Sequence, residues 1–403
     1  MKSSDYDEAM EKLISQVTYV KTKSVDIERL SGRILSEDIT AGINIPPFAR
    51  SPYDGYAFIS KDTDAVRTGE GNVTLRVIDN IRAGEVSKKK VTSGTAVRLM
   101  TGCPIPYGAD SVCKYEDTDF TDETVTIKKK YSPGDNIIEA GEDIKMGSVV
   151  LKAGSVIDPG AMGIISSLGM SQAKVFRRLR AGILTTGDEV VDVKNELSEG
   201  MIHDSNRYII SSALRGLNAK VSFIGHAADN RESIRGLIEE GLKKCDVIIS
   251  TGGVSAGDYD LIPEVMEDAG FEILTDGVSI KPGMACVYGI KSTKLMLALS
   301  GNPASALTNL HCVCMPALKK MAGYGQYRHE LTEMRICSDF TAKGRNLRFL
   351  RGRTKFEKGE IFFDYNTSQG NVVISSAAGA NAYVMVKPGD GIKTGDIVKG
   401  FMI

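Results

Sequence analysis

A glycine-rich loop in the middle of the chain carries residue types that could bind an anion. The stretch STGGVSAGDYD at 250–260 follows an apolar run and precedes an amphipathic one, so it joins a predicted buried strand to a predicted helix. Gly252 and Gly253 would let backbone N–H groups approach a ligand closely, and the hydroxyls of Thr251 and Ser255 add further donors. Because backbone donors beside the start of a helix form an anion site, the loop is a candidate phosphate cradle.

The same loop ends in carboxylates, which repel an anion unless a cation lies between them. Asp258 and Asp260 close the loop, and Glu189 and Asp204 lie in two other polar loops of the same region. Each carboxylate alone has an ordinary explanation, because aspartate caps helices and glutamate is usually solvated. Together they favour Mg²⁺, which takes one or two carboxylates along with phosphate oxygens and water. We therefore expect a phosphorylated ligand with a divalent cation.

Further polar side chains follow neighbouring predicted strands. In an open α/β sheet, ligands bind at the carboxyl ends of the strands. The stretch TTGDEV, with Asp188, and the stretch LSGNPASAL, with Asn302, Pro303 and Ser305, fall at such ends. We expect these loops to lie beside the candidate phosphate cradle.

The composition is that of an ordinary globular protein and excludes several functional classes. The chain has 403 residues, a formal net charge of -1, 42% hydrophobic residues and 25% charged residues. No basic excess points to nucleic acid, and no apolar run approaches the ~18 residues that a membrane span needs. The N-terminus is acidic and helix-like, unlike a signal or transit peptide. We therefore expect a cytoplasmic protein that binds neither nucleic acid nor membrane.

The seven cysteines are scattered, and an odd number cannot all pair within one chain. Their apolar neighbours predict buried free thiols in a reducing compartment. The stretch HCVC at 311–314 has the residue types of a metal site. However, Cys314 falls on the apolar stripe of a predicted helix, and no second ligand pair accompanies the stretch. Core packing is therefore the favoured interpretation.

The order of the predicted elements indicates a multidomain α/β protein. Strand-like runs alternate with helix-like runs in the second half of the chain, which predicts βαβ units, a parallel sheet and a doubly wound domain. The flanking regions have short strands with proline and glycine turns, which is typical of β-rich domains and of a small C-terminal barrel. The predicted boundaries are 21–45 and 141–176 for an elongated linker domain, 46–140 for a β-rich domain, 1–20 and 177–326 for the doubly wound domain, and 327–403 for the barrel-like domain.

Nine stretches, taken in order, resemble the molybdopterin molybdenumtransferase family, which includes the C-terminal domain of gephyrin. One glycine-rich loop is weak support for a family, but nine ordered matches that run nearly from end to end are strong support. The matching stretches are PPFARSPYDGYA, RLMTGCPIPYGAD, GEDIKMGSVV, LTTGDEV, IHDSNR, STGGVSAGDYD, IKPG, SGNPASAL and LRFLRG.

The resemblance implies both an architecture and a reaction. It implies a homodimer with four domains per chain, in which the doubly wound domain binds molybdopterin and the cleft is shared with the first β-rich domain of the partner. The implied substrates are adenylylated molybdopterin and molybdate. Molybdenum is inserted at the dithiolene sulfurs and AMP is released with the help of Mg²⁺. The resemblance also admits the molybdopterin adenylyltransferase as a partner.

The resemblance further implies roles for individual residues. Glu189 and Asp204 would hold Mg²⁺ and position water, and Asp54, Thr101 and Asp143 would complete the catalytic set. The residues implied for binding molybdopterin and molybdate are Thr251, Gly252, Gly253, Ser255, Asp258, Lys281, Asn302, Pro303, Ser305, Arg351 and Ser376.

The sequence departs from the family pattern at three positions. Tyr53 replaces a methionine, Ser300 replaces a proline, and Met284 replaces the second lysine of a KPGKP stretch. The lost lysine favours a second hypothesis, a scaffold or molybdopterin-binding protein with reduced turnover, whereas the intact acidic residues favour the enzyme. A tungstate-preferring paralogue is another alternative. A phosphate hydrolase that shares only the doubly wound domain is disfavoured by the matches outside that domain.

Overall fold

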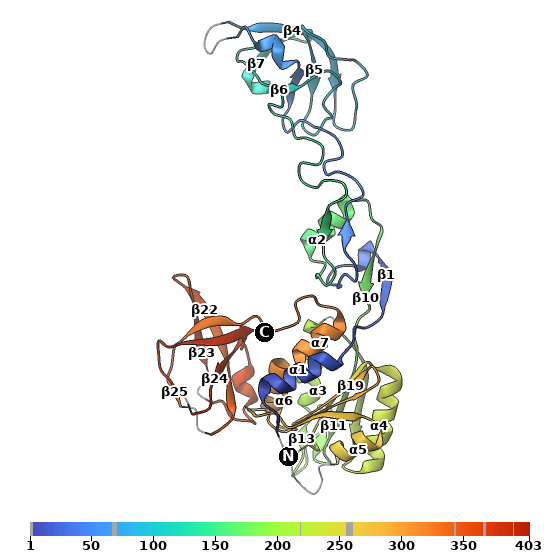
Figure 1. The fold of residues 1–403 in the computed structure, drawn as a ribbon, viewed down its shortest axis with the longest axis vertical. Helices are drawn as coiled ribbons and strands as arrows, with labels where there is room; N and C mark the ends of the chain where they lie inside the picture. Colours follow the sequence, from blue (N-terminus) through green and yellow to red (C-terminus); the bar gives the residue numbers. More distant parts are fainter. Residues whose placement is uncertain are drawn as a thin grey trace. The chain divides into compact units, whose positions relative to one another are not determined.

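The chain forms two compact units in the computed structural model, and each is described by itself (Figure 1). The structure describes residues 3–66, 71–217, 219–254, 261–341, 344–365, 368–389 and 391–403. The first unit comprises Met1–Glu37, Ala153–Pro159 and Gln172–Ile403, and the second comprises Asp38–Lys152 and Gly160–Ser171.

A mixed sheet with the strand order β14-β11-β15-β19-β18-β16 forms the centre of the first unit. Its strands β14, β11, β15 and β19 run parallel, as predicted, whereas β18 and β16 are antiparallel to their neighbours. The tight turn after Lys291 explains the reversal, because a parallel pair would need a long crossover between its strands. The strands span Arg180–Thr186 (β11), Lys220–Ala227 (β14), Val247–Thr251 (β15), Glu272–Asp276 (β16), Cys286–Lys291 (β18) and Lys294–Leu299 (β19).

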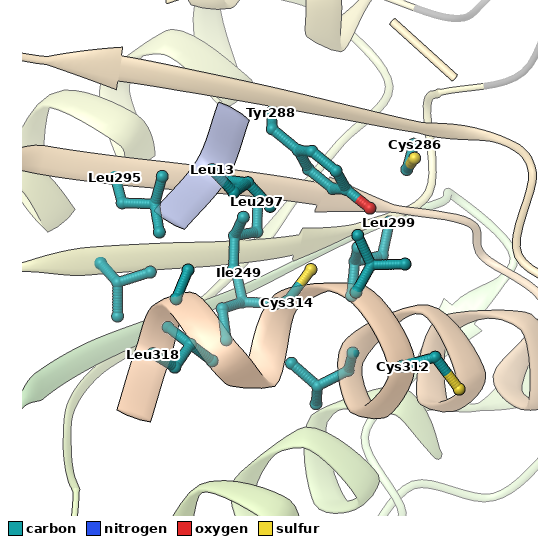
Figure 2. Packing of buried hydrophobic residues seen from close by; sticks show 14 of the residues in the cluster. Leu13, Ile249, Cys286, Tyr288, Leu295, Leu297, Leu299, Cys312, Cys314 and Leu318 are labelled. Atoms are coloured by element: carbon teal, nitrogen blue, oxygen red, sulfur yellow. The ribbon is translucent and has the colours of Figure 1, made fainter. Parts of the chain in front are cut away.

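Helices cover both faces of this sheet, so the domain is doubly wound, as predicted. Side chains alternate along each strand, and Ile249 of β15 therefore packs with one helix group while Ile248 packs with the other. Figure 2 shows part of the first cluster, including Leu13 and Leu318. One group contains α1 (Tyr6–Gln16), α3 (Asn206–Gly216), α6 (Pro303–Asn309), the π-helix η4 (Leu310–Cys314) and α7 (Met315–Ala322), and the other contains α4 (Arg231–Lys244) and α5 (Ile262–Asp268).

The π-helix η4 interrupts what the sequence predicts as one long helix. Pro316 has no N–H group, so the carbonyl of Cys312, four residues earlier, loses its helical partner. That carbonyl instead accepts a hydrogen bond from the hydroxyl of Tyr6 at 3.1 Å and lies 3.1 Å from Nε2 of His329. The interruption therefore ties α1 and the segment that leads to the C-terminal strands to one point in the core.

The cysteines are free thiols, and all except Cys337 are buried. The prediction of buried thiols is therefore wrong at Cys337. This residue follows buried Ile336 at the end of β20 (Thr332–Ile336), so the alternation of an extended chain turns it to solvent. Cys312 and Cys314 lie in the core, as the apolar stripe predicts.

The C-terminal strands close into a barrel, as predicted. The order is β22-β23-β20-β26-β24, and β24 also pairs with β22, which closes the ring. The short strand β17 (Ile280–Lys281) extends from the doubly wound domain to pair with β22. The barrel strands span Leu347–Glu357 (β22), Glu360–Tyr365 (β23), Ala382–Val386 (β24) and Ile397–Met402 (β26), with β21 (Phe340–Thr341) and β25 (Gly391–Ile392) paired beside them.

The second unit is built on a sheet with the order β6-β3-β5-β4-β8-β7. Tyr56 and Phe58 of β3 pack on one face and Ala57 packs on the other, so both faces are buried. Its strands span Gly55–Phe58 (β3), Val73–Ile81 (β4), Thr95–Leu99 (β5), Ser111–Lys114 (β6), Thr118–Phe120 (β7) and Thr124–Ile127 (β8).

Smaller elements complete the described chain. Helix α2 (Pro159–Ser167) starts at Pro159, where the sequence predicts a helix start. Two short antiparallel pairs join β1 (Thr22–Asp26) to β10 (Gln172–Phe176) and β2 (Ile39–Thr40) to β9 (Val149–Leu151). Among the described helices, none has both the length and the apolar character needed to cross a membrane.

Candidate functional site

The carboxyl ends of the parallel strands border an open pocket of about 730 Å³. It lies where the rule for open α/β sheets predicts a ligand site. The residues from the predicted set that line it are Glu189, Asp204, Thr251, Gly252, Gly253, Asn302, Pro303 and Ser305. The tertiary structure thus gathers loops that are far apart in the sequence around one space.

The glycine-rich loop needs its glycines for conformation and for close packing. Gly252 and Gly253 have φ angles of +95° and +63°, in the left-handed region that glycine adopts readily. A Cβ on Gly252 would lie 2.5 Å from Oγ1 of Thr186. The N–H of Gly252 donates to the carbonyl of Leu299 at 3.1 Å, so this donor serves the fold and not a ligand. The rest of the loop, including Ser255, Asp258 and Asp260, lies outside the described residues.

Asp204 is buried and held by two hydrogen bonds. Its carboxylate accepts from Oγ1 of Thr185 at 3.0 Å and from the backbone N–H of Arg207 at 3.0 Å. The second bond satisfies a free N–H in the first turn of α3, so the capping explanation is correct. Oγ1 of Thr185 also lies 3.1 Å from Nδ1 of His226. Asp204 therefore caps a helix and lines the pocket with one rigidly placed carboxylate.

Asp229 is a carboxylate of the pocket that the sequence reasoning missed. Its backbone N–H and side chain pair reciprocally with those of Asp188, at 3.3 and 3.4 Å. Partial burial raises the pKa of Asp229, and the nearby charges of Asp188 and Glu189 raise it further. The available signal was its position directly after β14, the neighbour of β11, where the same strand-end rule applies.

The described lining of the pocket contains carboxylates but neither lysine nor arginine. Glu189 folds back over Gly187, where a Cβ would lie 2.8 Å from the glutamate Oε2. Within the described ranges, no three His, Cys, Asp or Glu side chains form a ready-made metal cage. Mg²⁺ does not require one, because it is usually held by one or two carboxylates, water and substrate phosphate oxygens. The oxygen donors present therefore fit Mg²⁺ with a phosphate ligand.

Arg351 and Ser376 are brought together, but in the barrel rather than in the pocket lining. The Arg351 side chain is 1% exposed and donates from Nε to Oγ of Ser376 at 2.7 Å. Its Nη2 donates to the carbonyls of Gly370 and Val373 at 3.0 and 3.2 Å, while Nη1 has no hydrogen-bond partner among the described residues. Burial lowers the pKa of Arg351. Its carbonyl partners flank the segment 371–372, which lines the pocket, so Arg351 supports that wall.

Lys281 and Met284 lie at the two ends of one short loop. Lys281 is exposed on β17 and does not belong to the pocket lining, whereas Met284 does. Met284 is 47% exposed, and its sulfur accepts a hydrogen bond from Nδ2 of Asn346 at 3.4 Å. An apolar side chain therefore stands at the pocket where the family pattern has its second lysine.

Asp54, Thr101 and Asp143 belong to the second unit. Oδ1 of Asp54 accepts from both the backbone N–H and the hydroxyl of Thr101, each at 2.7 Å. These two bonds lower the pKa of Asp54 and keep its carboxylate charged. Asp143 is exposed on a different loop, anchored by its N–H to the carbonyl of Ile45 at 3.1 Å. The structure thus brings two of these three residues into contact.

Comparison with known protein families defines the class to which this fold and pocket belong. A family model described as "MoeA N-terminal region (domain I and II)" matches residues 4–169. A second, described as "Probable molybdopterin binding domain", matches residues 182–320, and a third, described as "MoeA C-terminal region (domain IV)", matches residues 334–400. The pocket described above lies mainly in the region of the second match. The class is therefore that of the MoeA proteins.

Individual relatives agree along nearly the whole chain. The molybdopterin molybdenumtransferase of Staphylococcus aureus (strain Mu50) is 35% identical over 393 residues, which is 97% of this chain and 93% of the relative. That of Staphylococcus epidermidis (strain ATCC 12228) is 32% identical over 392 residues, with the same coverage. The molybdopterin biosynthesis MoeA protein from Pyrococcus horikoshii OT3 has a TM-score of 0.85 at 27% identity, over 100% of both chains.

This chain belongs to the molybdopterin molybdenumtransferase family. The resemblance drawn from nine sequence stretches is confirmed, and so is the predicted class of enzyme, a transferase of molybdenum cofactor biosynthesis. The hydrolase alternative is wrong, because the relatives match far beyond the doubly wound domain.

Proposed function

We propose that this chain inserts molybdenum from molybdate into adenylylated molybdopterin and releases AMP in an Mg²⁺-dependent reaction. The observation that carries the proposal is the pocket at the strand ends. It combines a glycine-rich loop with the carboxylates of Glu189, Asp204 and Asp229, and its described lining has no lysine or arginine. A phosphorylated ligand therefore needs a cation to enter it, and family membership supports adenylylated molybdopterin as that ligand.

The three carboxylates of the pocket would have different roles. Glu189 and Asp204 would hold Mg²⁺, which when bound supplies positive charge that neutralises the phosphoanhydride and its leaving group. Asp204 is suited to this role because Thr185 and the first turn of α3 fix its orientation. Because its pKa is raised, Asp229 would lose its proton less readily than an isolated aspartate. A bound cation would favour its charged form.

The remaining walls of the pocket would bind and orient the substrates. Thr251 and Gly253, with Ser255 and Asp258 in the part outside the described residues, would hold the pterin phosphate, and Gly252 would shape the turn that lets the ligand approach. Asn302, Pro303 and Ser305 would form the facing wall. Lys281 would approach molybdate from the edge of the pocket. Arg351 and Ser376 would act through the wall that Arg351 supports.

We also propose the assembly that the family resemblance implies. The chain would form a homodimer in the cytoplasm, and Asp54, Thr101 and Asp143 of one subunit would complete the cleft of its partner. The charged Asp54 carboxylate, held by Thr101, is suited to such a role. The domain boundaries predicted from the sequence, and the molybdopterin adenylyltransferase as a partner that delivers the substrate, belong to the same proposal.

The experiment that tests the proposal measures AMP. Purified protein is incubated with adenylylated molybdopterin, Mg²⁺ and molybdate, and AMP is quantified by chromatography against reactions that lack one component each. AMP release that requires both Mg²⁺ and molybdate supports the proposal. Binding of adenylylated molybdopterin without AMP release would instead favour the scaffold hypothesis, to which Met284 at the pocket lends support. A parallel titration with tungstate decides whether the chain prefers that oxyanion.

A further inference from the structure

A buried amide holds one wall of the pocket from behind. Gly283, Met284 and Ala285 lie in the loop after β17 and contribute to the pocket lining. Behind them lies Asn309, the last residue of α6, with a side chain that is 1% exposed. Its Nδ2 atom donates a hydrogen bond to the carbonyl oxygen of Gly283 at 2.9 Å. A buried amide is costly unless it is hydrogen-bonded, so this contact is a specific feature of the wall.

The partners of Asn309 determine the orientation of its amide. A backbone carbonyl can only accept, so Nδ2 must face Gly283 and Oδ1 must face the opposite way. Oδ1 accepts from the hydroxyl of Tyr288 at 2.7 Å and from the thiol of Cys314 at 3.3 Å. Both donors lie in the buried cluster (Figure 2), where burial raises the pKa of each and keeps it protonated. Every polar atom of the amide side chain is therefore engaged.

The π-helix explains how Cys314 reaches Asn309. Residues five apart in an α-helix point to different sides, because its repeat is 3.6 residues. In a π-helix the hydrogen bonds run from i to i+5, and the wider turn returns residue i+5 to nearly the same side. η4 begins at the residue after Asn309 and ends at Cys314. The interruption of the helix thus completes the set of hydrogen-bond partners of the amide.

The wall also has little room to move. Gly283 has a φ angle of +107°, and a Cβ there would lie 3.2 Å from Cβ of Asn309 and 3.2 Å from the carbonyl oxygen of Ser305. The loop therefore packs directly on α6, whose first turn lines the pocket from the other side. The hydrogen bond from Asn309 to Gly283 and the close packing of Gly283 on α6 set the distance between the loop 283–285 and the first turn of α6.

We propose that Asn309 is a positioning residue for the oxyanion substrate. Its Nδ2 bond to Gly283 holds the loop 281–285 against α6, so that Lys281 and Met284 keep the separation from Ser305 that molybdate needs. The inference rests on the proposed function and deepens it, because it names a residue that controls molybdate affinity without touching the substrate. Tyr288 and Cys314 both donate to Oδ1, so Cys314 still satisfies this oxygen when the Tyr288 hydroxyl is removed, and the Gly283 carbonyl by itself fixes the orientation of the amide.

Two variants separate this role from ordinary core packing. Asn309→Leu keeps the branched shape of the side chain and removes the bond to Gly283. Tyr288→Phe is the matched control, since it removes a hydrogen bond to the same amide and leaves the bond to Gly283. Both variants should lower the melting temperature. Only Asn309→Leu should raise the molybdate concentration for half-maximal AMP release, by about tenfold, the equivalent of one hydrogen bond, with a much smaller change in kcat.

A second measurement does not depend on turnover. Hydrogen–deuterium exchange of a peptide covering 280–286 should be faster in Asn309→Leu than in the wild type, and unchanged in Tyr288→Phe. Should Asn309→Leu fail to fold, Asn309→Ser replaces it, because its hydroxyl is too short to reach Gly283.

The outcomes distinguish the two proposals. A wild-type chain that releases no AMP would overturn the proposed function, and the exchange measurement would still test the loop contact. An active wild type whose Asn309→Leu variant keeps the same half-saturation would overturn the positioning role. Unchanged exchange at 280–286, or equal effects of both variants, would overturn it as well.

Discussion

Asp204 serves the helix α3 and the pocket with one carboxylate. Replacing it by alanine would remove the bond to the N–H of Arg207 along with the charge, and the lost cap alone costs about 1 kcal/mol. Asp204→Asn and Glu189→Gln keep size and hydrogen-bonding oxygen but remove the charge. We expect each to lower AMP release by about 100-fold or more, because a lost metal ligand costs several kcal/mol in the transition state.

The control for these variants is Glu196→Gln, an exposed glutamate outside the pocket lining, which should retain full activity. Melting temperatures establish that the variants are folded. Near-normal turnover by both pocket variants would show that these carboxylates do not hold the cation.

Met284 provides a second test at the scale of single residues. Its side chain is 47% exposed at the pocket, so a longer charged side chain has room there. A lysine would add a charge-assisted hydrogen bond to the oxyanion, which is worth ~1.5–3 kcal/mol. We expect Met284→Lys to lower the half-saturating molybdate concentration by roughly 10- to 100-fold without changing the affinity for molybdopterin.

Met402→Lys is the matched control for this change, because Met402 is 48% exposed and lies on β26, outside the pocket lining. Met402→Lys should leave the half-saturating molybdate concentration unchanged. An unchanged or higher value for Met284→Lys would mean that position 284 does not face the bound oxyanion.

At the scale of elements, the π-helix η4 and the segment before β20 place two histidines in apolar surroundings. Burial lowers the pKa of His311 and of His329 to about 4. The charge of His329 lowers the pKa of His311 further. The charge of Lys319 lowers the pKa of His329, whereas hydrogen bonds to the backbone of Cys312 and His311 raise it. The folded pKa lies below the ordinary value of 6.5, so unfolding takes up protons in the interval between them. The stability that these neutral histidines contribute is complete above about pH 6.5 and is lost as the pH falls toward 4.

We therefore expect the melting temperature to fall between pH 7 and pH 5, and His311→Phe to make that fall shallower. Phenylalanine keeps the ring that packs against Tyr383 and cannot take up a proton. Each histidine contributes at most about 1.4 kcal/mol per pH unit to the slope. If the melting temperature changes equally with pH in the wild type and in His311→Phe, protonation of His311 does not contribute to the loss of stability.

For the whole molecule, the proposed shared cleft predicts complementation between inactive subunits. Asp54 lies in the second compact unit and Glu189 in the first. When Asp54→Ala and Glu189→Ala chains exchange subunits, a heterodimer should recover one of its two clefts. Glu189→Ala mixed with Asp204→Ala is the control, because both changes fall in the same unit and no cleft is restored. Absence of recovery in the first mixture, despite demonstrated exchange, would indicate that each cleft is built within one chain.

Local patterns of the sequence determined the elements, the barrel and the family. The i, i+4 spacing of Ile210 and Leu214 predicts α3, and both residues are buried on its inner face. The alternation of strands and helices predicts the doubly wound domain, and nine ordered stretches predict the family. These signals are local, so they can be recognised from the sequence alone. The same strand-end rule that predicts Glu189 and the glycine-rich loop also covers Asp229, which follows β14.

Only the tertiary structure decided how distant residues meet. The reversal of β18, the bond between Asn309 and Gly283 and the burial of Arg351 beside Ser376 all join segments without any pattern that links them in the sequence. A hydrogen bond depends on the distance and direction between two atoms, and these are set by the packing of whole elements. The sequence by itself therefore determined which residue types are present and which elements hold them. Packing decided that Glu189, Asp204 and Asp229 share the pocket, and that Lys281 and Arg351 remain outside its lining.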